Sequence, residues 1–132
     1  MSRGSKRPKW MRDIAKERIE ILFTLATKEF SQNPLRSHRY VELARNISKK
    51  YKTKIPKKWS HSYCKTCYKF LFPNKNSRVR LVSSEVHIKC HECNNVMIIP
   101  YKKEKKLKRR LNINAYIIQK GANEQSSFHN NN

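Results

Sequence analysis

All the cysteines of this chain fall into two Cys-x-x-Cys pairs, Cys64/Cys67 and Cys90/Cys93, with 22 residues between them. A pair with this spacing turns both thiolates toward one ion from a single tight loop, or knuckle. Two knuckles together provide the tetrahedral four-sulfur set of a structural zinc site. We therefore predict that these four cysteines bind one structural Zn²⁺ as cofactor. Iron in a rubredoxin-like site fits the spacing equally well, but the surrounding lysines and arginines favour an RNA-binding protein over an electron carrier.

Other uses of the cysteines agree less well with the sequence. No apolar segment typical of a signal peptide follows the basic residues between Arg3 and Lys9, so we expect a cytoplasmic protein with reduced thiols rather than disulfides. A redox Cys-x-x-Cys normally occurs once. Catalytic zinc is disfavoured as well, because four thiolates leave no coordination position for an activated water.

Short apolar or alternating segments surround the knuckles and predict β-strands. They are 70–72, 78–82, 86–88 and 96–99, separated by turn-forming residues at 73–77 and 83–84. We predict a three- or four-stranded antiparallel zinc ribbon over residues 63–101, with the metal at one end. A sheet of this size buries too little apolar surface to be stable alone, so the metal must contribute much of the folding free energy.

Helical periodicity precedes the ribbon. Apolar residues from Asp13 to Phe30 cover an arc of roughly 200° around a helix. After a break at 31–33, Asn33-Pro34 is typical of an N-cap, and apolar residues then recur every three or four positions as far as Tyr51. This pattern predicts an antiparallel two-helix hairpin over residues 11–52. The arc of the first helix is wider than one neighbouring helix covers, which indicates a second partner outside the chain.

The predicted fold class is therefore α+β, with the helical hairpin at the N-terminal side and the zinc ribbon at the C-terminal side. A basic and aromatic linker over residues 53–62 joins the two parts. Residues 1–10 form a basic flexible arm, and residues 102–132 form a basic tail. The tail carries a block of like charge and ends in an Asn-rich segment, so we expect it to be largely disordered.

The charge of the chain indicates a polyanionic partner. The chain has 31 lysines and arginines and 9 acidic residues, which give a formal net charge of +22. Nucleic acid is the leading candidate, because cations neutralise phosphates while the aromatic rings between them can stack on unpaired bases. No apolar segment of about 20 residues predicts a membrane span. We expect neither a membrane partner nor a small-molecule substrate. The predicted RNA-binding residues are Lys54, Lys57, Lys58, Lys65, Lys69, Lys75, Arg78, Arg80, Lys102 and Lys103.

The order of these motifs resembles one known family. The helix over 39–47, the Lys54-Ile55-Pro56 segment, the first knuckle, the Asn76-x-Arg-x-Arg turn, the second knuckle and Pro100-Tyr101 follow one another as in the zinc-ribbon protein subunit of ribonuclease P. That family comprises protein component four of archaea and its eukaryotic relatives. The resemblance covers about 14–101. It departs from many ribbons at Tyr68 and Asn94, where glycine commonly follows the second cysteine in a conformation with positive φ.

The resemblance implies a function. Members of this family are accessory proteins of a ribozyme that removes the 5′ leader of precursor tRNA, with catalysis on the RNA rather than on the protein. They bind the specificity domain of ribonuclease P RNA together with a small β-barrel protein subunit, and meet precursor tRNA through the holoenzyme. Carried over by position, the residues that face the protein partner or support that face are Ile14, Arg18, Ile19, Leu22, Leu25, Tyr40 and Ile47.

Two other functions remain open from the sequence. One is a different non-enzymatic zinc ribbon that binds nucleic acid, either ribosomal or related to transcription. The other is a nuclease activity of the chain itself. Two-metal nucleases cluster carboxylates, whereas this chain has a single aspartate, Asp13. A metal-free mechanism would instead need a positioned histidine pair among His61, His87 and His91.

Overall fold

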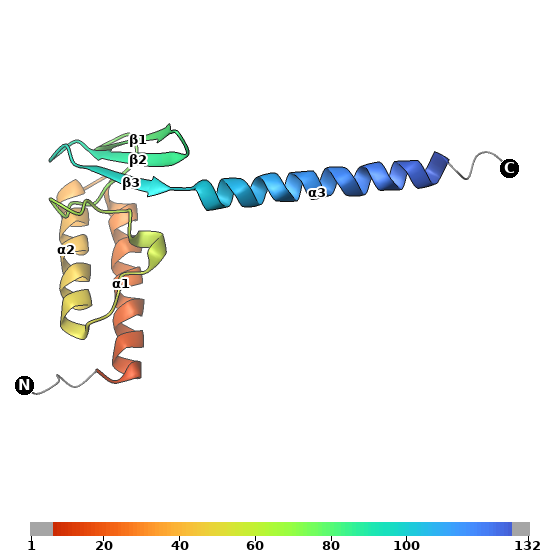
Figure 1. Cartoon of the computed structure of the whole chain (residues 1–132). Coiled ribbons are helices and arrows are strands. Elements are labelled where there is room, and N and C mark those ends of the chain that lie inside the picture. Colours follow the sequence, from red (N-terminus) through yellow and green to blue (C-terminus); the bar gives the residue numbers. More distant parts are fainter. Residues whose placement is uncertain (1–6, 128–132) are drawn as a thin grey trace, which may run out of the picture. The chain divides into compact units, whose positions relative to one another are not determined.

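The computed structural model describes residues 7–127, with side chains as far as Ala122. Figure 1 shows helices, a small sheet and a further helix in chain order. The chain divides into two compact units, one of residues up to Arg80 with His87–Met97, the other of Leu81–Val86 with the residues from Ile98 onward. The elements are α1 (Lys9–Glu29), α2 (Pro34–Tyr51), the 3₁₀ turn η1 (Lys57–Trp59), β1 (Ser77–Val82), β2 (Glu85–Cys90), β3 (Val96–Pro100) and α3 (Lys102–Ser127).

The predicted start of the second helix is confirmed by its capping contacts. The side-chain oxygen of Asn33 accepts a hydrogen bond from the Arg36 backbone N–H at 3.2 Å, and Pro34 occupies the first turn. Because proline lacks an N–H and has its φ fixed near the helical value, it suits this position. The helix ends at Tyr51. The C-cap residue Lys52 has a left-handed backbone, with φ 50°, and its N–H bonds back to the carbonyl of Lys49.

Helices α1 and α2 lie side by side (Figure 1), and their buried side chains form one apolar core. The hydroxyl of Ser37 is fully buried in this interface and donates a 2.7 Å hydrogen bond to the carbonyl of Ala26, so its polarity is satisfied between the helices. The core extends to the segments that follow α2, where the Phe23 ring stacks on Trp59 at 5.5 Å. Its buried residues are Ile19, Phe23, Ala26, Phe30, Val41, Ala44, Tyr63 and Phe70.

The sheet has three antiparallel strands in the order β1-β2-β3. The segment 70–72, which the sequence allowed as a fourth strand, forms only an isolated bridge between Tyr63 and Phe70. The side chain of Asn76 explains this outcome: its amide donates to the carbonyl of Phe70 at 2.6 Å and accepts from the N–H of Phe72 at 2.7 Å. It thereby satisfies backbone groups that a neighbouring strand would otherwise bond.

The prediction of a largely disordered tail was wrong for residues 102–127, which form the helix α3. The block of positive charge suggested disorder, but the lysines, arginines, leucines and alanines of α3 are strong helix formers. Glu104 also lies in the first turn, where the helix dipole favours a negative charge. The N-terminal arm is also shorter than predicted, since α1 begins at Lys9; residues 1–6 and 128–132 lie outside the described part. Within that part, none of the helices combines the length and apolar character that crossing a membrane requires.

Candidate metal centre and nucleic-acid interface

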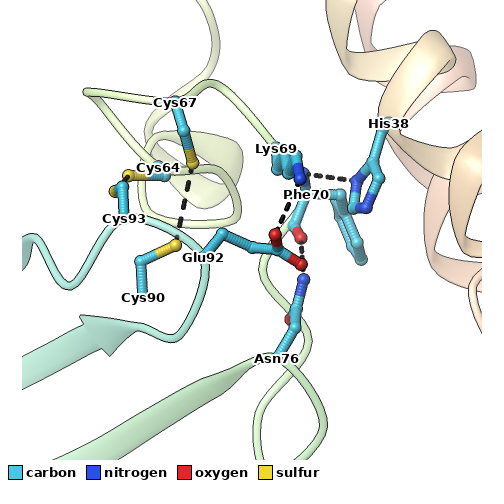
Figure 2. A network of polar contacts seen from close by, with 9 residues as sticks. All are labelled: His38, Cys64, Cys67, Lys69, Phe70, Asn76, Cys90, Glu92 and Cys93. Atoms are coloured by element: carbon cyan, nitrogen blue, oxygen red, sulfur yellow. Dashed lines mark hydrogen bonds and ion pairs between the residues drawn. The ribbon is translucent and has the colours of Figure 1, made fainter.

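The four cysteines of the two knuckles come together in space (Figure 2), and all four sulfur atoms lie within 4.8 Å of one another. The sulfurs of Cys64 and Cys93 are 3.4 Å apart, and those of Cys67 and Cys90 are 3.7 Å apart. A tetrahedral ion with metal–sulfur bonds of about 2.3 Å requires sulfur–sulfur separations of about 3.8 Å. No disulfide joins these thiols. The four cysteines could therefore hold one metal ion.

The two knuckles have a backbone hydrogen bond and a residue with positive φ at equivalent positions. The N–H of Cys64 bonds to the carbonyl of Lys69 at 3.0 Å, and the N–H of Cys90 bonds to the carbonyl of Asn95, five residues on in both cases, at 2.9 Å. Each turn also has a residue with positive φ four positions after its first cysteine, Tyr68 with 59° and Asn94 with 57°. These are the two positions at which many ribbons carry glycine, so both knuckles keep the positive φ although Tyr68 and Asn94 depart from that pattern.

Asparagine tolerates this left-handed conformation, whereas a bulky side chain such as that of Tyr68 pays about 1–2 kcal/mol for it. The guanidinium carbon of Arg45 on α2 lies 3.3 Å from the centroid of the Tyr68 ring. A cation–π contact contributes about 0.5–2 kcal/mol, depending on how much water it excludes, so this stack offsets the backbone strain. Tyr68 as a whole nevertheless remains 43% exposed.

The cysteine thiols differ in acidity. Burial by itself would raise the pKa of Cys64, but the backbone N–H groups of Cys67 and Thr66 and the neighbouring thiols outweigh it and lower this pKa to about 6. Burial and the nearby thiols raise the pKa of Cys67 to about 12. Four thiolates this close repel one another unless a cation lies among them. A divalent ion would therefore be bound with release of protons.

A polar network next to the cysteines connects the first knuckle to the second knuckle and to α2 (Figure 2). The ammonium of Lys69 lies 2.7 Å from the carboxylate of Glu92, and this contact raises the pKa of Lys69 and lowers the pKa of Glu92. The N–H of Phe70 donates to Nδ1 of His38 at 3.1 Å. The sequence predicted none of these pairs, because their members lie 23 and 32 positions apart.

The predicted RNA-binding cations are mostly exposed but differ in their surroundings. Lys58 pairs with Glu20 at 3.4 Å, Lys65 lies 4.0 Å from the Tyr63 ring centroid, and Lys75 bonds to Ser31 at 3.0 Å. Lys69 is half-buried and paired, as described above. Lys102 and Lys103 begin α3, in the other compact unit. The exposed members are Lys54, Lys57, Lys58, Lys65, Lys75, Arg78, Arg80, Lys102 and Lys103.

Strand β1 presents the two arginines of the Asn-x-Arg-x-Arg turn. Five of its six residues are exposed, and only Ser77 is buried. Arg78 and Arg80 are two positions apart, so their side chains leave the strand on the same face. Within residues 7–127 neither arginine forms an ion pair. Both guanidinium groups are therefore available to an external anion.

A basic groove was missed by the sequence analysis. Lys9, Arg12 and Lys16 on α1 line it together with Lys52 and Lys54, and Asp13 is its acidic member. Positions 9, 12 and 16 share one helix face. The sequence contained this signal, but the predicted hairpin began at residue 11 and its periodicity was counted only from Asp13, so Lys9 was assigned to the flexible arm and Arg12 was not placed on a helix face.

The residues predicted to face or support a protein partner fall into three groups by burial. Ile19 is fully buried in the core between α1 and α2, so it lies beneath that face and could only support it. Ile14 and Leu25 are 49% and 37% exposed, and Arg18 is exposed. Leu22, Tyr40 and Ile47 are half-buried against the core. Leu22, Leu25 and Ile47 also line an apolar groove together with Ile21 and Leu43, which the sequence-based selection omitted.

Residues 18–114 match the family model described as the RNAse P Rpr2/Rpp21/SNM1 subunit domain. The chain belongs to this family. Among members of the Rpr2/Rpp21/SNM1 family, ribonuclease P protein component 4 of Methanobrevibacter smithii is 62% identical over 110 residues, which are 83% of this chain and 90% of that protein. The corresponding protein of Methanosphaera stadtmanae is 51% identical over 99 residues, 75% of this chain and 95% of that protein.

A solved structure supports the same membership in the Rpr2/Rpp21/SNM1 family. The fold is similar to that of a chain in the cryo-EM structure of archaeal ribonuclease P with mature tRNA, with a TM-score of 0.67 and 40% sequence identity. The match covers 89% of this chain and 98% of that chain. It therefore includes both the helices and the segment that carries the cysteines.

Proposed function

We propose that this chain is a protein subunit of the ribonuclease P ribonucleoprotein, which removes the 5′ leader of precursor tRNA, and that it binds and stabilises the catalytic RNA. The observation that carries the proposal is the 62% identity, over most of both chains, to a ribonuclease P protein component 4. Catalysis is assigned to the RNA, and the chain contributes binding surface.

The metal of the cysteine cluster is proposed to be Zn²⁺, and the region around it a zinc ribbon that follows a two-helix hairpin. Thiolate ligands and sulfur separations near those of a tetrahedron suit this ion. Four cysteines complete the coordination shell, so the ion would stabilise the fold and leave no position for an activated water. When bound, it would hold the knuckles together and so position Lys69 and Tyr68 beside α2.

The RNA-binding surface is proposed to include Arg78 and Arg80 of β1 and the groove around Lys54. The support is chemical: both arginines are exposed and without an ion pair in the described part, and the groove gathers five cations around one carboxylate. Guanidinium groups bind phosphates in a bidentate manner, and each phosphate neutralised releases counterions. Binding here would be sensitive to salt and would depend little on RNA sequence.

The second partner is proposed to be the β-barrel protein subunit, docked on the exposed apolar face of α1 and α2. Ile14, Ile21 and Leu25 leave 49%, 45% and 37% of their surface open along α1. Adjacent apolar side chains of this kind are typical of protein interfaces. The proposed setting is the cytoplasm, where reducing conditions keep the four thiols available to the metal.

Copurification tests this function. A tagged copy of the chain is expressed at a low level in Methanobrevibacter smithii, whose protein component 4 is 62% identical, and the bound RNA and proteins are identified. Enrichment of ribonuclease P RNA and of a small β-barrel protein is expected. Enrichment of ribosomal RNA or of RNA polymerase would instead support the ribosomal or transcription-related alternative. Incubation of the purified chain alone with precursor tRNA tests the nuclease alternative, and the transcript should remain intact.

A further inference from the structure

A groove lies between α2 and the first knuckle, with Tyr68 and Arg45 in its wall. Arg39, Glu42 and Lys69 line it as well, and we call it the Tyr68 groove. Its volume of about 460 Å³ lies within the range of roughly 300–1,000 Å³ that small-molecule sites occupy. All of these residues belong to the same compact unit. None of them except Lys69 was among the predicted RNA-binding residues.

The aromatic ring in this groove is not required by the knuckle. The second knuckle adopts the same turn with Asn94 at the equivalent position, and asparagine accepts positive φ readily. The only aromatic residue with positive φ in residues 7–127 is Tyr68. A bulky side chain kept in a strained backbone conformation is a signal of function.

The ring is held in place without being covered. The Arg45 guanidinium lies 3.3 Å from the ring centroid, yet 43% of Tyr68 remains exposed. Tyr63, only five positions earlier, is 8% exposed and belongs to the hydrophobic core. The difference distinguishes a tyrosine that packs in the core from one that stays accessible to solvent. A flat ring fixed by a cation beneath it needs little further ordering when another flat group stacks on it.

The charges around the ring favour a base with one phosphate over a cluster of phosphates. Arg39 pairs with Glu42 at 2.7 Å, and Lys69 pairs with Glu92 at the same distance. The side chains of Arg39 and Glu42 are 61% and 54% exposed. Exposed ion pairs of this kind are weak, so a phosphate can displace the carboxylate from Arg39. The two carboxylates nevertheless limit how much negative charge the groove accepts.

We propose that Tyr68 is a stacking site for an unpaired RNA base, with Arg45 fixing its ring and Arg39 contacting the adjoining phosphate. The proposal rests on the proposed function, since it deepens RNA binding by this chain. It assigns to the first knuckle a contact that requires unpaired nucleotides, because a base within a duplex does not expose its face. The arginines of β1, by contrast, need only phosphates.

The test compares two RNA probes on the full-length, metal-loaded chain. One probe is a short single-stranded RNA that carries the fluorescent base 2-aminopurine, and the other is a duplex of the same length. Affinity is measured by anisotropy, and stacking is measured by quenching of 2-aminopurine. The variants are Tyr68→Asn, which copies the residue of the second knuckle, Tyr68→Gly as a second strain-free replacement, and Tyr68→Phe, which keeps the ring.

Wild type and Tyr68→Phe are expected to quench the probe. Tyr68→Asn and Tyr68→Gly should lose quenching and bind the single strand roughly 5- to 150-fold more weakly, the value of one base–aromatic stack. Their duplex affinity, metal content and thermal transition should stay at or above the wild-type values. The proposal would be overturned if wild type did not quench the probe, or if neither replacement changed the affinity for the single strand. RNA binding through Arg78 and Arg80 would stand in both cases. Failure of wild type to bind either RNA would overturn the proposed function as well.

Discussion

The backbone N–H of Phe70 donates a hydrogen bond to Nδ1 of His38 across 3.1 Å, although the two residues are 32 positions apart. This bond fastens the segment after the first knuckle to α2. Because Nδ1 is the acceptor, the imidazole must be neutral, with its proton on Nε2. Phe70 is 3% exposed, so its N–H would be left without a partner if His38 could not accept. The contact therefore depends on pH.

The stability of the fold should fall as the medium is acidified below about pH 6.5. Burial lowers the pKa of His38, the charge of Lys69 lowers it further, and Glu92 only partly opposes them. The unfolded chain therefore binds this proton first, near the ordinary value of 6.5, while the folded chain resists it. The contribution of His38 is complete above that pH and is lost as the pH falls through the folded pKa. Thermal denaturation across this range measures it.

A non-titrating acceptor is the control for this effect. His38→Gln offers an amide oxygen to Phe70 and should weaken the pH dependence between neutral and mildly acidic solution. The pKa of His61 is also lowered, by burial and then by Lys65, so that part of the dependence should remain. His38→Ala removes the acceptor and should lower stability by about 1–3 kcal/mol at neutral pH. An unchanged pH profile in His38→Gln would exclude His38 as the titrating group.

Loss of one cysteine ligand should release the metal and melt the region around the sheet. Cys64 is fully buried, and structural zinc supplies on the order of 10–16 kcal/mol of apparent binding free energy in zinc-finger peptides. In Cys64→Ser we expect loss of bound metal and a much lower thermal transition, while α1 and α2 keep helical signal from their shared core. His91→Ala, an exposed position inside the second knuckle, serves as control and should retain its metal. Wild-type metal content in Cys64→Ser would refute the structural role.

Replacement of Arg78 and Arg80 by alanine should weaken RNA binding and reduce its salt dependence. Each phosphate contact contributes about 0.7 to 0.9 to the slope of log affinity against log salt, so two contacts should flatten it by about 1.4 to 1.8. Filter binding over a salt series measures both quantities. The control is the double variant Lys28→Ala with Arg36→Ala, which removes the same amount of charge from the helices. It should bind RNA more tightly than the β1 double variant. Equal losses in the two double variants would show that only net charge matters.

A charge placed on the apolar face of α1 should prevent docking of the protein partner. Ile21→Asp and Leu25→Asp alter exposed side chains of the apolar groove, so the fold should persist. Loss of a central interface contact commonly costs about 2 kcal/mol or more, which corresponds to a roughly 30-fold weaker complex. Calorimetric titration with the β-barrel subunit gives the affinity. Thr27→Asp, exposed elsewhere on α1, should bind normally, and undiminished binding by the groove variants would place the interface on another face.

The sequence predicted the local features of this molecule better than its long-range contacts. The pairing of the knuckles and the cap at Asn33 follow from residue type and short spacing, and the structure has both. Positive φ at Asn94 suits its residue type, whereas at Tyr68 the residue type argued against it, and the structure has it all the same. Contacts such as Arg45 with Tyr68 depend on how α2 packs against the first knuckle, which no periodicity encodes. The helix α3 was missed because charge repulsion was weighted above helix propensity.

Reconstitution of ribonuclease P tests the central claim most directly. Ribonuclease P RNA of Methanobrevibacter smithii is assembled with its other protein subunits, and this chain replaces protein component 4, to which it is 62% identical. Cleavage of the 5′ leader from precursor tRNA is then measured at limiting magnesium with and without the chain. The account predicts that the chain restores cleavage and that its omission, or Cys64→Ser, does not. Cleavage that is the same with and without the chain would contradict its assignment as a ribonuclease P subunit.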